Sequence, residues 1–131
     1  MNDKSIDNIM VIESEPVLRQ ELASALDDNV FIVAGVSDYF EALWRLDEFK
    51  PDLVIIDEKL PLMDGWEACR CLSQTFGVPA IIMGTSTDSE AWLKALEVGA
   101  DFYLRTPFSP MVLASRVRAI LRRYKKDTAT N

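Results

Sequence analysis

The sequence predicts a doubly wound α/β domain, in which a five-stranded parallel sheet is covered by helices on both faces. Short, continuous apolar runs alternate five times with segments that have helical spacing. Strands that are apolar along their whole length are typical of a parallel sheet with helical crossovers. The chain has 131 residues, of which 49% are apolar and 27% charged, so it can bury one such core without disulfides.

The apolar runs and the helical segments follow one another in strict order. The predicted strands are residues 9–12, 30–36, 53–56, 79–83 and 102–104. The predicted helices are residues 16–26, 38–49, 66–76, 88–98 and 110–124. Proline fits the first turn of the first helix at Pro16 and of the last helix at Pro110. Ser37 or Asp38 is an N-cap candidate, and Gly77 and Gly99 are placed as helix stops.

These elements form one domain over residues 9–124, with residues 1–8 as an N-terminal tail. Residues 125–131 are expected to be a C-terminal tail or the start of a linker to an output domain. No apolar run is long enough to span a membrane, and the polar start shows no secretory signal. Cys69 and Cys71 are spaced unfavourably for a bridge. Two thiols without a disulfide framework suggest a cytoplasmic protein.

Charge and composition restrict the functions open to the chain. It contains no histidine, so it lacks the commonest general base and transition-metal ligand. The net charge of −7 disfavours nucleic-acid binding by this chain alone, although Arg116–Lys126 is locally basic. An enzyme or a flavin carrier on the same fold is disfavoured because Glu13–Pro16 replaces a glycine-rich phosphate loop after the first strand. We therefore expect a protein that is not an enzyme.

Two carboxylates are predicted at the carboxyl edge of the sheet, where α/β folds place their chemistry. Glu13 follows the first strand and Asp57 ends the third, and these strands are neighbours in the flavodoxin-like order 2-1-3-4-5. A divalent cation such as Mg²⁺ would relieve their repulsion, and a metal-bound carboxylate can act as a nucleophile towards a phosphoryl donor. The alternative is that both residues are solvated charges that cap strand ends.

Four segments resemble the receiver domains of two-component response regulators: residues 9–16, 51–65, 79–86 and 99–108. The most specific segment is Pro51–Asp57, followed by Leu60-Pro61 and Met63-Asp64-Gly65. The resemblance covers about residues 8–124. It implies that Asp57 accepts a phosphoryl group from a histidine kinase and that Glu13, Asp57 and the backbone of Lys59 hold Mg²⁺ weakly.

Three site positions depart from the family pattern. The second acid after the first strand is replaced by Ser14, which is a poorer Mg²⁺ ligand. The switch hydroxyl at the end of the fourth strand falls on Gly84, and Thr85 could replace it only if the strand end shifted. The lysine after the fifth strand is replaced by Thr106, which removes a fixed positive charge. These departures predict an atypical receiver with impaired magnesium binding and switching.

Three further residues near this edge each allow two interpretations. Tyr103 matches the aromatic that turns inward on activation in the family, or it is a half-buried packing residue. Lys59 could swing over the pocket as a mobile cation, or it is a solvated loop lysine. Arg105 is expected to point away from the pocket, as a surface or partner-facing charge.

The last helix resembles that of the winged-helix (OmpR/PhoB) class of response regulators, through Arg116–Arg123. That class forms a two-fold dimer through helix four, strand five and helix five. Asp101 and Arg116 occupy positions suited to charged pairs across such a dimer, whereas Phe102 replaces a usual acid. The alternative is a solvated basic helix face.

Two functional hypotheses follow. The first is a signal-transduction receiver that regulates an output domain or partner through Asp57, with DNA contacted only through an output domain absent from this chain. The second is a phosphorylation-independent pseudo-receiver that acts as an interaction or dimerisation module.

Overall fold

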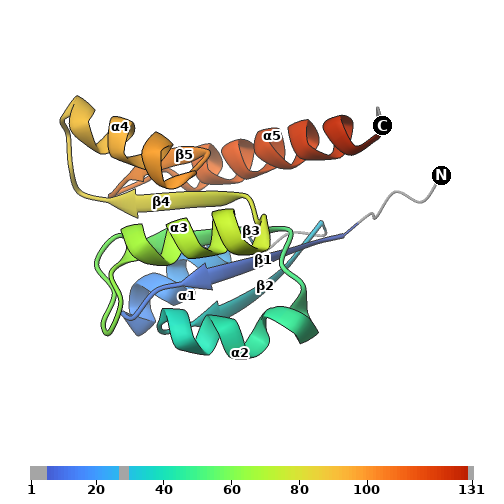
Figure 1. The fold of residues 1–131 in the computed structure, drawn as a ribbon, viewed down its shortest axis with the longest axis horizontal. Helices are drawn as coiled ribbons and strands as arrows, with labels where there is room; N and C mark the ends of the chain where they lie inside the picture. Colours follow the sequence, from blue (N-terminus) through green and yellow to red (C-terminus); the bar gives the residue numbers. More distant parts are fainter. Residues whose placement is uncertain (1–5, 27–29, 130–131) are drawn as a thin grey trace.

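The fold is a five-stranded parallel sheet between two layers of helices, seen in a computed structural model that describes residues 6–26 and 30–129. The strands are β1 (Asp7–Ile12), β2 (Phe31–Val36), β3 (Leu53–Asp57), β4 (Ala80–Gly84) and β5 (Phe102–Arg105). The helices are α1 (Pro16–Ala25), α2 (Tyr39–Phe49), α3 (Gly65–Phe76), α4 (Ser89–Val98) and α5 (Pro110–Ala129). All strand pairs are parallel and the order is β2-β1-β3-β4-β5 (Figure 1), which confirms the predicted fold class.

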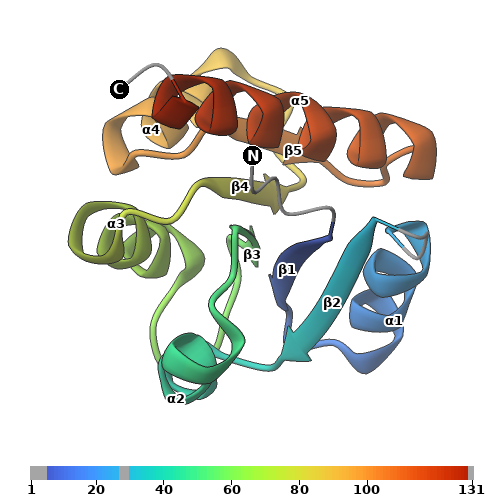
Figure 2. The ribbon, with the colours of Figure 1, turned by 90° about the vertical axis from the view of Figure 1, so that its right-hand side faces the viewer.

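The core has two halves because the sheet is buried on both faces. One half lies between the sheet and α2, α3 and α4, and includes Ile12, Ile56 and Ile82. The other lies between the sheet and α1 and α5, and includes Ile55 and Ile81. Figure 2 shows the sheet passing between α1 and the α2–α3 pair. Successive strand residues alternate between the two halves, which explains why the strands are apolar throughout.

Helix caps lie close to the predicted positions. Asp38, Asp64 and Asp88 begin α2, α3 and α4 by accepting backbone hydrogen bonds from the first turn. Gly77 and Gly99 end α3 and α4 in the left-handed conformation, with φ of 67° and 90°. Both cysteines are free thiols.

Both ends of the domain extend beyond the predicted boundaries. β1 begins at Asp7, whose backbone N–H donates to Val30, so residues 7 and 8 belong to the sheet and not to a tail. α5 continues to Ala129, past the predicted end near Tyr124. The Lys125 ammonium lies 3.1 Å from the Asp7 carboxylate and ties the two ends together. Residues 1–5 and 130–131 of the predicted tails lie outside the described residues. Within the described part of the chain, no helix is both long and apolar enough to cross a membrane.

The loop from β3 to α3 is held against the end of β3 through Gly65. Its backbone N–H donates to the Glu58 carbonyl at 2.9 Å. A Cβ atom at Gly65 would overlap the backbone carbonyl of Asp57 and crowd Glu58 Cα, neither of which can move without displacing the strand end. Only glycine at residue 65 therefore allows the chain to pass this close to Asp57.

Replacing Gly65 by alanine is expected to lower the free energy of unfolding by about 3 kcal/mol, because the added methyl group meets backbone atoms. The control is Gly77→Ala, where φ is unfavourable for a side chain, unlike at Gly65, but the Cβ would meet nothing within 4 Å. That change is expected to cost about 1–2 kcal/mol from backbone strain alone. Urea unfolding followed by circular dichroism measures both, and equal losses would contradict the proposed overlap.

Candidate functional site

The predicted site residues meet at the carboxyl edge of the sheet, towards which the strand arrows point in Figure 1. Ile12 is paired with Ile56, so Glu13 and Asp57 leave neighbouring strands at the same level. Asp57 is in turn paired with Met83, which places Gly84 close to Asp57 at the same edge. The backbone N–H of Thr106 donates to the Gly84 carbonyl at 2.7 Å and closes this edge on the β5 side.

Glu13 and Asp57 form an acidic pair of unequal exposure. Glu13 is completely buried, and its Oε2 accepts the backbone N–H of Glu15 at 3.0 Å. Its Oε1 receives no hydrogen bond from any residue that the structure describes. Asp57 is half-buried, and its Oδ1 accepts the backbone N–H of Lys59 at 2.8 Å. Asp57 is thus the carboxylate of the pair that an incoming group can reach.

Burial gives Glu13 an unusual protonation behaviour. Desolvation by burial, followed by the neighbouring Asp57 carboxyl group, raises the pKa of Glu13 to about 8. A buried carboxyl beside a second carboxyl is more stable with a proton than without one. A cation at this edge would reverse that preference, because it would stabilise both ionised groups.

The donor set fits a weakly bound Mg²⁺ ion. The buried Glu13 Oε1 lacks a partner, and carboxylate and carbonyl oxygens are the ligands that Mg²⁺ prefers. However, the described residues contain no cluster of three or more His, Cys, Asp or Glu side chains suited to a metal. Ser14, which replaces the second acid of the family pattern, is half-exposed. Glu13, Asp57 and the Lys59 carbonyl are the groups that would hold the ion.

Neither Thr85 nor Thr106 replaces the hydroxyl that is missing at Gly84. β4 ends at Gly84 without a shift, so Thr85 lies beyond the strand and is exposed. Thr106 is half-buried, and its Oγ1 donates to the Gly84 carbonyl at 3.2 Å. The peptide bond between Thr106 and Pro107 is cis. No side chain of β4 therefore reaches towards Asp57 from residue 84.

Tyr103 is buried, with only 2% of its surface exposed, and it has two polar partners. Its hydroxyl donates to Glu58 Oε1 at 3.1 Å and accepts the backbone N–H of Ser86 at 3.0 Å. Trp66 stacks on its ring with a centroid separation of 6.0 Å. Burial, more than the neighbouring Glu58, raises the pKa of the Tyr103 phenol above its ordinary value.

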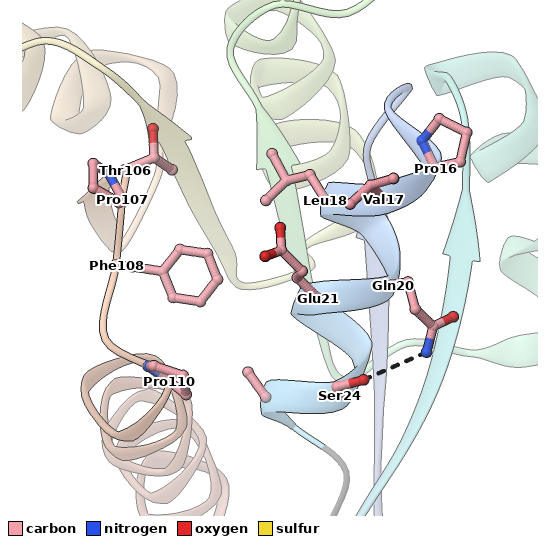
Figure 3. Close-up of a pocket in the computed structure, with 11 residues that line it drawn as sticks. Pro16, Val17, Leu18, Gln20, Glu21, Ser24, Thr106, Pro107, Phe108 and Pro110 are labelled. Carbon is pink, nitrogen blue, oxygen red and sulfur yellow. Dashed lines mark hydrogen bonds between the residues drawn. The ribbon is translucent and has the colours of Figure 1, made fainter.

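A cavity of about 150 Å³ opens over the carboxyl end of β3. It is lined by Leu18, Asp57, Glu58, Lys59, Met83, Gly84, Thr85 and Thr106. A larger apolar groove of about 730 Å³ lies next to it, between α1 and the loop that joins β5 to α5. Figure 3 shows Leu18 and Phe108 facing one another across this groove. Leu18 and Thr106 line both spaces, so the groove leads towards Asp57.

Comparison with known proteins identifies the family to which the chain belongs. Residues 9–118 match the response regulator receiver domain family. The chain belongs to this family. It is 38% identical over 127 residues to the DNA-binding response regulator MtrA of Mycolicibacterium smegmatis, which covers 97% of this chain and 56% of MtrA. It is 33% identical to the response regulator GraR of Staphylococcus aureus, over 92% of this chain and 54% of GraR. The chain therefore spans about half the length of these relatives.

Solved structures agree. A response regulator structure from Chloroflexus aurantiacus superimposes with a TM-score of 0.82 at 28% identity, covering 89% of this chain and 98% of that one. The predicted resemblance to receiver domains is confirmed, and a DNA-binding regulator among the relatives fits the suspected class.

Asp101 and Arg116, the two residues predicted at a dimer face, both make contacts within their own chain. Asp101 accepts hydrogen bonds from the Ala80 backbone N–H at 3.0 Å and from the Tyr124 hydroxyl at 2.8 Å. Arg116 is exposed and lies over the Phe102 ring, 4.3 Å from its centroid. The structure thus brings neither residue to the other. Arg105 and Lys59 are both exposed, and Lys59 also lines the cavity beside Asp57, so both interpretations of Lys59 stay open.

Sequence reasoning missed Glu58, the partner of Tyr103. An acid in the turn after a strand resembles an ordinary solvated charge, and nothing in its own segment marks it. The available signal was Gly84, because a missing side chain on the neighbouring strand leaves space for a longer one from residue 58.

The buried carboxyl of Glu13 predicts a specific pH dependence of stability in EDTA-containing buffer. Its ordinary pKa is 4.5 and its folded value is about 8, so its contribution is complete below pH 4.5 and is lost as the pH rises to 8. Glutamine does not ionise, so Glu13→Gln should not lose stability over this range and should be more stable than wild type at pH 8, by about 1–3 kcal/mol. Thermal unfolding of both proteins from pH 4.5 to 8 measures their difference in stability. A stability difference that does not change with pH would contradict the raised pKa of Glu13.

Proposed function

We propose that this receiver domain takes a phosphoryl group from a histidine kinase onto Asp57 and so regulates an output domain or partner. The observation that carries the proposal is the position of Asp57. It ends β3, is half-buried beside the fully buried Glu13, and opens into a cavity at the edge where parallel sheets place their ligands. The family match over residues 9–118 supports the same role.

The proposed transfer is a displacement at phosphorus. A carboxylate oxygen of Asp57 forms the new bond, and the bond from phosphorus to the imidazole nitrogen of the donor breaks. Mg²⁺ held by Glu13, Asp57 and the Lys59 carbonyl would supply positive charge to the phosphoryl oxygens. The chain itself positions Asp57 through the Lys59 backbone N–H at 2.8 Å.

The site is built for slow transfer. Ser14 supplies no charge for a metal, Gly84 supplies no hydroxyl, and Thr106 supplies no cation for the transferred group. The Thr106 hydroxyl is instead directed to the Gly84 carbonyl. Because loss of one preorganised stabilising group costs a reaction about 10²–10³-fold in rate, we expect an atypical receiver with weak phosphorylation.

The groove between α1 and the β5–α5 loop is the surface through which we propose the donor protein approaches. It is mostly apolar along Val17, Leu18 and Phe108 and leads directly to the Asp57 cavity. Val17 is 73% exposed, which leaves its side chain available to a partner.

The second candidate function is a phosphorylation-independent interaction module. The observation that favours it is the buried state of Tyr103, whose hydroxyl is bonded to Glu58 of the same chain. In either case we propose a cytoplasmic protein that contacts DNA only through an output domain, because this chain carries a net charge of −7.

Incubation with acetyl phosphate and Mg²⁺ is expected to add one phosphoryl group slowly, as seen in the intact mass. Asp57→Asn should abolish the adduct, whereas Asp47→Asn on α2 should leave it unchanged. Ser14→Asp combined with Thr106→Lys should raise the rate by about 10²-fold or more, because both changes restore groups that stabilise the transferred charge. No adduct in wild type and in this double variant would refute phosphorylation and leave the interaction module.

A homodimer through α4, β5 and α5 is proposed as the output state, with Arg116 at its centre. Trp92 and Leu96 on α4 are 44% and 69% exposed and would be covered in such a dimer. Sedimentation equilibrium should then show weaker self-association for Arg116→Ala and unchanged association for Arg45→Ala on α2. Equal association constants, or a monomer at all concentrations, would argue against this face.

A further inference from the structure

Glu58 turns its side chain back towards the sheet, although it follows the acceptor in a surface turn. Its Oε1 accepts the Tyr103 hydroxyl at 3.1 Å, and this tyrosine is almost completely buried. The same hydroxyl accepts the Ser86 backbone N–H, so both functions of the phenol oxygen are used. A hydrogen bond to a carboxylate is stronger than one between neutral groups, and this one is partly buried.

Gly84 creates the space that this contact occupies. A Cβ atom built on Gly84 would overlap the carboxyl carbon and Oε1 of Glu58 and also the hydroxyl oxygen of Tyr103. The carboxylate and the phenol therefore meet in the volume that any side chain at residue 84 would fill. Both overlapping groups are the far ends of movable side chains, so a larger residue would expel them and leave the backbone in place.

The Tyr103 ring connects this contact to the exposed face of α4, β5 and α5. Trp66 stacks on one side with an interplanar angle of 3°, and Trp92 meets the ring edge-on at a centroid distance of 6.4 Å. Trp92 also packs edge-on against Phe102 at 4.9 Å, and Arg116 lies over Phe102. A change in the Tyr103 rotamer would therefore disturb an unbroken series of ring contacts that reaches the surface.

We propose that Glu58 is a positioning residue that holds Tyr103 inward in the unphosphorylated chain, and so sets the α4–β5–α5 face independently of Asp57. The inference goes beyond the proposed phosphorylation and does not need it. The carboxylate of Glu58 occupies the space that the side chain of residue 84 would take. The unphosphorylated chain then presents the surface that the inward Tyr103 ring sets.

The same carboxylate opposes phosphorylation of its neighbour. Asp57 and Glu58 line one small cavity, and a phosphoryl group adds about −1.5 to −2 charge at neutral pH. Like charges in a confined space repel. The Glu58–Tyr103 contact and a phosphorylated Asp57 therefore disfavour each other.

The test follows the Tyr103 ring by NMR, in protein labelled at its three tyrosines and without any phosphodonor. Wild type should give a nuclear Overhauser effect between the Tyr103 and Trp66 rings. Glu58→Ala should lose it because the acceptor is gone, and Glu58→Gln should keep it because the amide oxygen still accepts. Gly84→Ala should also lose it because the methyl group expels both partners. The control Glu97→Ala removes an exposed glutamate on α4 and should change nothing.

An unchanged signal in Glu58→Ala and Gly84→Ala would overturn the proposal, since packing by the tryptophans would then suffice to hold the ring. Loss in Glu58→Gln as well would also overturn it, because the hydrogen bond would not be the cause. Circular dichroism confirms that each variant is folded. Asp57→Asn should retain the wild-type signal, so failure of phosphorylation and failure of this proposal are separate results.

Discussion

The repulsion among three carboxylates at one edge of the sheet is the constraint on which the site depends. Strand pairing brings Glu13 and Asp57 to the same level, and Glu58 follows directly. Each acid is accommodated differently. Glu13 is buried and favours its proton, Asp57 faces the cavity and accepts a backbone N–H, and Glu58 turns away to accept a phenol hydroxyl. The three environments separate what would otherwise be a single cluster of like charge.

These environments are provided by the fold and not by the acids themselves. The two-sided core fixes the strands, and the close approach of Gly65 to Asp57 fixes the turn that carries Glu58. The 57–65 loop therefore cannot relax to spread the charges apart. The tyrosine that receives Glu58 is held by aromatic neighbours from α3 and α4, so helices on one face of the sheet take part in the electrostatics of its edge.

The fold could be predicted because its determinants are local and periodic. Apolar runs, aspartate caps and glycine stops place most elements within one or two residues, and the position of Asp57 at the end of its strand follows from the same pattern. The boundaries that failed involve polar residues with distant partners, such as Asp7 with Lys125. Glu58 was missed for the same reason. Its partner is 45 residues away, and the space it occupies is defined by an absent side chain at residue 84.

The shared volume above Gly84 makes residues 58 and 84 a single unit of sequence variation. A side chain at one position excludes the inward conformation of the other, so the two are expected to change together during divergence of the family. Glycine at the end of the fourth strand should accompany a long hydrogen-bond acceptor after the phosphorylatable aspartate. A serine or threonine at the position of residue 84 should accompany a residue at position 58 whose side chain points outward. This joint pattern can be sought in sequences alone, without a structure for each chain.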